Sequence, residues 1–185
     1  MNPDFFQHFN DLLSAAMNTV NYSELVEIAT KIKETAASGK KIIIVGNGGS
    51  AAMASHVSVD LTKTVKCRSV TFNEADLLTC FANDYGYELW VEKAIEFYAD
   101  KGDMAILISS SGSSKNIING AIKAKEMGLT VVTLSGFSDN NPLRVLGDIN
   151  LWVDSKGYNI VEMTHHIWLV AIVDYIVGKI EYKSN

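Results

Sequence analysis

The sequence predicts an α/β fold in which a parallel sheet carries helices on both faces. Short apolar runs rich in β-branched residues, such as residues 41–45, are typical of strands buried in a parallel sheet. These runs alternate with longer segments whose apolar residues recur at helical spacing. This alternation implies right-handed strand–helix–strand units, and such units place helices on both sides of the sheet.

In the first half of the chain, two amphipathic helices precede the first strand, and Gly39 ends the second of them. A glycine-rich loop follows the strand at residues 46–50. The predicted elements are helices at 4–19 and 23–38, a strand at 41–45, a helix at 51–63, a weak strand at 69–72, and helices at 76–83 and 87–99.

The second half repeats the pattern. A strand leads into a Ser/Gly loop at residues 109–114, and Gly128 closes the helix after it. The predicted elements are strands at 104–108, 129–134 and 149–153, and helices at 117–127, 140–146 and 159–182. The last helix is apolar almost all round, which predicts burial, here between subunits.

Composition narrows the function classes. The 185 residues fit one domain spanning 1–185, with residues 1–38 as an N-terminal helical extension. The net charge of −5, from 16 Lys+Arg against 21 Asp+Glu and without a basic cluster, argues against nucleic acid as a ligand. The longest apolar stretch, residues 167–173, is too short to span a membrane.

Hydrophobic residues make up 48% of the chain, so we expect surplus apolar surface to form a subunit interface. The first 20 residues lack the basic start and apolar run of a signal peptide. We therefore expect a cytoplasmic protein.

The loop Gly46-Asn47-Gly48-Gly49-Ser50 joins a strand to a helix. Glycine lets the backbone approach a ligand closely, and the exposed N–H groups of a helix start favour an anion. The spacing matches neither a dinucleotide fingerprint nor a Walker loop, so we expect no nucleotide cofactor. A plain tight turn with a serine cap explains the same residues, and both interpretations stay open here.

The second loop, residues 109–114, carries five serines and Gly112 at the end of a strand. Hydroxyls and backbone amides together can wrap a phosphate without any Lys or Arg. One serine would suit a helix cap, but five favour a phosphate site.

Together the two loops resemble those of the sugar isomerase (SIS) domain family. His56 and Asp60 on the next predicted helix, Asn83-Asp84-Tyr85-Gly86, and Gly102-Asp103 extend the resemblance to the phosphoheptose isomerase type. The order and spacing fit over nearly the whole chain.

The resemblance implies a three-layer α/β/α, flavodoxin-like sandwich and a homotetramer. It also implies conversion of sedoheptulose 7-phosphate to D-glycero-D-manno-heptose 7-phosphate, for the heptose of bacterial lipopolysaccharide or capsule. Asn47, Gly48, Ser50 and Asp84 would contact the sugar. The phosphate would lie on the loop serines, namely Ser109, Ser110, Ser111 and Ser114.

The catalytic positions depart from the family pattern. Asp60 stands where the family usually has Glu, and a carboxylate there still suits a base. Val161 and Leu169 occupy positions where the family places Gln and His. His165 lies between them on the same helix face, so we expect it to supply the acid/base imidazole, although a buried core histidine is the alternative. His166 points about 100° away, toward an interface or the opposite face.

Some relatives bind zinc at this site, and here His56, Asp60 and His165 would be the ligands. Two other functions remain open. A non-catalytic homologue would bind a phosphosugar or serve as a scaffold for a replication initiator, which suits the loss of Gln and His. An isomerase of another phosphosugar would keep the same residues, because none of them determines the number of carbons in the sugar.

Overall fold

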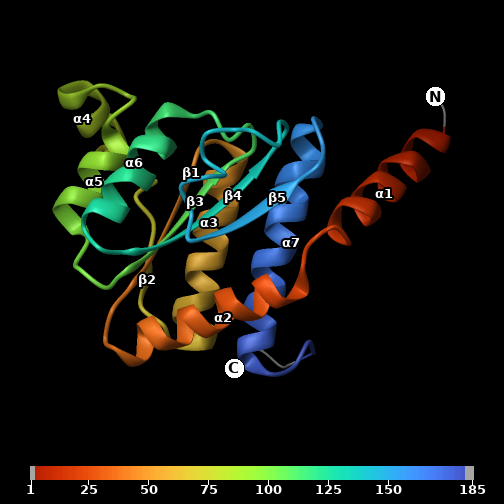
Figure 1. Ribbon diagram of the computed structural model, residues 1–185, viewed down its shortest axis with the longest axis horizontal. Helices are drawn as coiled ribbons and strands as arrows, with labels where there is room; N and C mark the ends of the chain where they lie inside the picture. Colours follow the sequence, from red (N-terminus) through yellow and green to blue (C-terminus); the bar gives the residue numbers. More distant parts are fainter. Residues whose placement is uncertain (1–2, 182–185) are drawn as a thin grey trace.

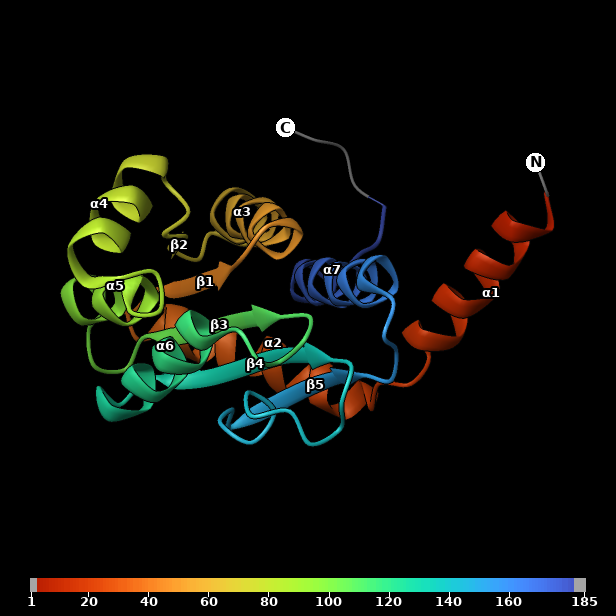
Figure 2. The same ribbon diagram turned by 90° about the horizontal axis from the view of Figure 1, so that it is seen from above.

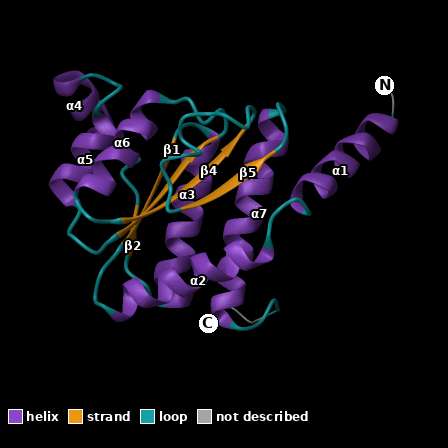
Figure 3. Ribbon diagram, viewed as in Figure 1, coloured by secondary structure: helices purple, strands orange, loops and turns teal. Residues whose placement is uncertain are grey.

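Five parallel strands form the sheet at the centre of the fold, in the order β2–β1–β3–β4–β5 (Figures 1 and 3). The computed structural model describes residues 3–181. The strands are β1 (Ile42–Gly46), β2 (Ser69–Val70), β3 (Met104–Ser109), β4 (Thr130–Gly136) and β5 (Ile149–Val153). Every residue of β1 and β3 is buried, as expected for strands covered on both faces.

Seven α-helices accompany the strands: α1 (Asp4–Met17), α2 (Tyr22–Ala37), α3 (Gly49–Asp60), α4 (Ala75–Tyr85), α5 (Trp90–Tyr98), α6 (Lys115–Glu126) and α7 (Tyr158–Val177). Successive strand side chains point to opposite faces. Ile42 and Ile44 pack with α2, α3 and α7, whereas Ile43 and Val45 pack with α5 and α6. Figure 2 shows α3 and α7 on one face of the sheet and α5 and α6 on the other. The three-layer α/β/α prediction is confirmed.

Three predicted elements differ from the structure. The predicted helix at 140–146 is a series of turns, in which Asn141 donates to the carbonyl of Ser138 and accepts from the amide of Arg144. The predicted strand at 69–72 shrinks to two residues. The last helix ends at Val177, because Gly178 adopts φ +83 as its cap, and residue 182 lies outside the described residues.

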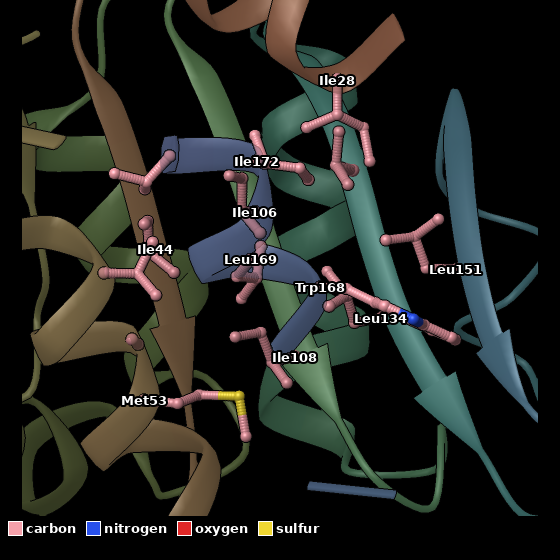
Figure 4. Close-up of a cluster of buried hydrophobic side chains, with 14 of the residues drawn as sticks. Ile28, Ile44, Met53, Ile106, Ile108, Leu134, Leu151, Trp168, Leu169 and Ile172 are labelled. Atoms are coloured by element: carbon pink, nitrogen blue, oxygen red, sulfur yellow. The ribbon is translucent and has the colours of Figure 1, made fainter. Parts of the chain in front are cut away.

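By length and composition alone, helix α7 could span a membrane, but nearly half of its apolar stretch is buried in this fold. Its Trp168 and Leu169 side chains lie against Ile106, Ile108 and Leu134 of the sheet (Figure 4). Packing on the sheet therefore explains the apolar residues on this face of α7. In contrast, α1 projects from the body, and of its side chains only Ala16 is buried (Figures 1 and 2).

Candidate active site

The two predicted binding loops meet at one edge of the sheet. Strands β1 and β3 are neighbours, and the chain leaves β1 toward β2 on one side but reaches β3 on the other. This reversal opens a crevice at the carboxyl ends of the two strands, where ligands bind in open α/β sheets. The loop after β1 and the loop after β3 both lie there.

The two loops line a cleft of about 100 Å³ at this position. Six of the predicted substrate-binding residues line it: Asn47, Ser50, Ser109, Ser110, Ser111 and Ser114. Ile108, Tyr158 and Glu162 complete the lining. Gly48 and Asp84 are not among these residues. The prediction that the two loops form one site is therefore met by the geometry, while their contacts with a substrate stay predictions.

Glycines give the loops their shape. Gly48 precedes α3 with φ +54, and Gly112 turns the serine loop with φ +64, a region that side chains rarely adopt. A Cβ at Gly112 would collide with the side chain of Asn141, and one at Gly49 would collide with the carboxylate of Glu162. Neither position leaves room for a larger residue, so the backbone comes close to both side chains.

Hydrogen bonds hold the serines in place. The Ser109 hydroxyl donates to that of Ser114 at 3.0 Å, and Ser110 donates to Glu162 Oε1 at 3.4 Å. No Lys or Arg lines the cleft in the part of the chain that the structure describes. An anion here would be held by hydroxyls and by the amides at the start of α6.

A cluster of three titratable side chains lies along the contact between α3 and α7. Nδ1 of His56 is 2.8 Å from Nε2 of His166, and Nε2 of His56 is 3.3 Å from Oδ2 of Asp60. Glu162 in the cleft precedes His166 by one helical turn, which is about 6 Å along α7. The cluster therefore continues the cleft along the same pair of helices.

Burial lowers the pKa of His166, and the neighbouring His56 lowers it further, while the Asp60 carboxylate opposes the shift. A lowered pKa keeps the imidazole neutral near pH 7, the form that can accept a proton. The sequence analysis placed His166 toward an interface or the opposite face and not at the site. The one available signal was its i+4 spacing from Glu162, on the side of α7 that meets α3.

His165 requires a correction. It is fully buried, and its Nε2 lies 3.0 Å from the carbonyl oxygen of Ser135 in β4. Burial lowers its pKa to about 4. Val161 and Leu169 share its helix face, as expected, and are also buried. That face packs on the sheet rather than on the cleft, so His165 is a core residue and not the acid/base group.

Asp84 lies apart from the cleft within the described subunit. It lies in the last turn of α4, is exposed, and accepts hydrogen bonds from the side chains of Asn83 and Cys80. Three residues later, however, the hydroxyl of Tyr87 donates to Asn47 Oδ1 at 3.3 Å. The segment that carries Asp84 is therefore tied to the first loop.

The expected zinc ligands do not assemble. His56 and Asp60 are neighbours, but His165 faces the sheet. Across residues 3–181, no three His, Cys, Asp or Glu side chains are grouped so that they would hold a metal ion. Asp60 also faces the opposite ring nitrogen of His56 from the one that meets His166. The donor set therefore does not fit the zinc site that the resemblance implied.

Comparison with known proteins shows which family the chain belongs to. Residues 4–136 match the SIS domain family. A probable phosphoheptose isomerase of Thermoplasma acidophilum is 34% identical over 171 residues, covering 89% of this chain and 91% of the relative. The chain belongs to the phosphoheptose isomerase family. A phosphoheptose isomerase of Aliarcobacter butzleri is 35% identical over 166 residues, covering 86% of this chain and 87% of that protein.

Solved phosphoheptose isomerases have the same architecture. The enzyme from Neisseria gonorrhoeae aligns with a TM-score of 0.86 at 25% identity, over 95% of this chain and 97% of that one. The Francisella tularensis protein aligns with the same TM-score at 20% identity, over 95% and 96% of the two chains. The second likeness shows the shared fold. The structural likeness therefore covers nearly the whole chain.

Proposed function

We propose that the protein is an aldose–ketose isomerase that converts sedoheptulose 7-phosphate to D-glycero-D-manno-heptose 7-phosphate, in the cytoplasm, for surface polysaccharide synthesis. The observation that carries the proposal is the continuity of two features. The serine-lined cleft suits a phosphate, and the His56–His166 pair lies one helical turn farther along α7. A sugar phosphate bound by its phosphate would extend its carbon chain from the loops toward the two imidazoles.

The reaction moves one proton between adjacent carbons and another between their oxygens. The base takes a proton from carbon 1, and the electron pair forms the double bond of an enediolate. Return of a proton to carbon 2, and transfer of another from the carbon-1 oxygen to the carbon-2 oxygen, yields the aldose. Atoms and electrons balance within the substrate.

The directions of the hydrogen bonds in the histidine cluster indicate which ring nitrogen acts as the base. The Asp60 carboxylate only accepts, so it favours the proton on Nε2 of His56. Nδ1 of His56 then accepts from Nε2–H of His166. The remaining Nδ1 of His166, which has no partner among residues 3–181, is left as the free base. We give zinc no step, because the described donor set does not fit it.

A phosphosugar panel tests the proposal. Sedoheptulose 7-phosphate, a pentose 5-phosphate and a hexose 6-phosphate are each incubated with the pure protein, and conversion and binding are measured separately. We expect turnover of the heptulose phosphate above the others. Faster turnover of a shorter sugar phosphate would show that the shorter sugar is the substrate. Binding of all three without conversion would identify a phosphosugar-binding or scaffold protein.

We also propose that the chain assembles as a homotetramer through its exposed apolar surface. An apolar groove of about 280 Å³ lies between α2 and α7, lined by Tyr22, Leu25, Val26, Ala171, Ile172 and Tyr175. On the projecting α1, Phe5, Phe6 and Leu12 are exposed. The proposed assembly is tested by measuring the mass of the protein in solution. Wild type is compared with Phe6→Glu and with the control Val145→Glu. A monomeric wild type would contradict it.

A further inference from the structure

Three segments that carry predicted substrate contacts converge on the side-chain amide of Asn47. Asn47 belongs to the loop after β1 and lines the cleft. Asn116 lies two residues after the serine loop, at the start of α6, and is 2% exposed. Tyr87 follows the segment that contains Asp84.

Asn47 and Asn116 form a reciprocal amide pair. Nδ2 of Asn47 donates to Oδ1 of Asn116 at 3.0 Å, and Nδ2 of Asn116 donates to Oδ1 of Asn47 at 2.9 Å. The Tyr87 hydroxyl also donates to Oδ1 of Asn47, at 3.3 Å. A rotation of either amide about its terminal bond would set like groups against each other, so the pair fixes both orientations.

Most of the hydrogen-bonding groups of the Asn47 side chain are therefore occupied within the protein. An amide oxygen has two acceptor positions, and Asn116 and Tyr87 fill both. An amide nitrogen has two hydrogens, and one of them is used by Asn116. The other has no partner within the described chain and belongs to a side chain that lines the cleft.

We infer that Asn116 is a positioning residue, which holds Asn47 so that it meets the substrate only as a hydrogen-bond donor. Because the serine loop and the start of α6 suit the phosphate, the group left for Asn47, on the other loop, is a carbonyl or hydroxyl oxygen on the carbon chain of the sugar phosphate. The inference rests on the proposed function for the class of ligand, but it concerns binding and not turnover.

A second contact supports the same arrangement. Glu88, next to Tyr87, accepts from Lys115 Nζ at 2.8 Å, and its carbonyl accepts from Asn119 Nδ2 at 2.9 Å. Lys115 and Asn119 flank Asn116 on α6. Segment 87–88 is thus fastened to the helix that presents Asn116, which keeps the Tyr87 hydroxyl within reach of Asn47.

Calorimetric binding of sedoheptulose 7-phosphate and of inorganic phosphate tests the inference. We expect Asn116→Ala and Asn47→Ala each to weaken sugar-phosphate binding about tenfold, the usual effect of losing one hydrogen bond to a ligand. Phosphate binding should stay within about twofold of wild type, because the serine loop is untouched. The double variant should bind no more weakly than Asn47→Ala, because Asn116 acts through Asn47.

Two more variants keep the test decisive if Asn116→Ala does not fold. Asn116→Asp has nearly the same shape and still accepts from Asn47, but it cannot donate. Tyr87→Phe removes one hydroxyl. Both should weaken sugar-phosphate binding by less than tenfold, with phosphate binding unchanged. Unchanged sugar-phosphate binding in every variant, additive losses in the double variant, or an equal loss of phosphate binding would overturn the inference. Sugar-phosphate binding without turnover in wild type would count against the proposed function alone.

Discussion

Nδ1 of His56 lies 2.8 Å from Nε2 of His166, and this contact joins α3 to α7 across 110 positions of sequence. It places an imidazole that can accept a proton one turn from the serine-lined cleft. The neighbouring His165 is turned into the core. The proposed chemistry depends on this difference between two adjacent histidines.

Replacing His166 is expected to abolish most turnover. His166→Ala should lower kcat for sedoheptulose 7-phosphate by about 10²- to 10⁴-fold, the range for loss of a general acid–base group. Inorganic phosphate binding should be retained, because the serine loop is unchanged. Lys101→Ala, at an exposed position just before β3 and away from the cleft and α1, is the control. Full activity in the His166→Ala variant would show that His166 takes no part in the reaction.

Asp60 is expected to act by fixing the tautomer of His56. Asp60→Asn keeps the shape but offers a donor, which favours the wrong ring nitrogen, so kcat should fall at least tenfold. Asp60→Glu retains a carboxylate and should recover part of the loss. Steady-state kinetics should show the change in kcat rather than KM. An active Asp60→Asn variant would show that the tautomer of His56 is not set by this carboxylate.

Gly112 is expected to be indispensable to the serine loop. Gly112→Ala would place a methyl group at φ +64 and into the side chain of Asn141, so phosphate binding should be lost. Gly39→Ala is the matched control, since Gly39 has φ +72 but open space around it. It should cost only about 1–2 kcal/mol of stability. Equal phosphate binding by both variants would contradict the proposed loop geometry.

His165 is expected to make the fold sensitive to acid. Its pKa falls from 6.5 to about 4 on folding, so the unfolded chain takes up a proton first as the pH drops. Stability is therefore lost between these two values, by about 2 kcal/mol between pH 7 and pH 5. Urea unfolding at the two pH values measures it. His165→Leu should show a smaller loss between them; an identical loss would contradict a neutral buried imidazole.

The sequence predicts local features of this protein well. The apolar runs predicted as strands at 41–45 and 104–108 form β1 (Ile42–Gly46) and β3 (Met104–Ser109). The glycine and serine loops meet because these parallel neighbours end at the same side of the sheet. These features depend on nearby residues and on sheet topology. The predicted helix at 140–146 fails because the side chain of Asn141 bonds to backbone groups that a helix would use differently.

The role of the histidines could not be predicted from the same signals. His165 and His166 differ by about 100° on α7, and which one meets α3 depends on how the helix rests on the sheet. Val161 and Leu169 share the face of His165 and fill the core, so that face turns inward. The contact of His56 with His166 is tertiary, and no spacing within either helix reveals it.

The most direct test of the central claim is incorporation of deuterium from solvent during turnover. Sedoheptulose 7-phosphate is incubated with the pure protein in D₂O, and the sugar phosphates are examined by NMR. Proton transfer through an exchangeable imidazole predicts aldoheptose 7-phosphate that carries deuterium at carbon 2. Recovery of the ketose alone, with both carbon-1 protons intact although the sugar phosphate binds, would contradict it.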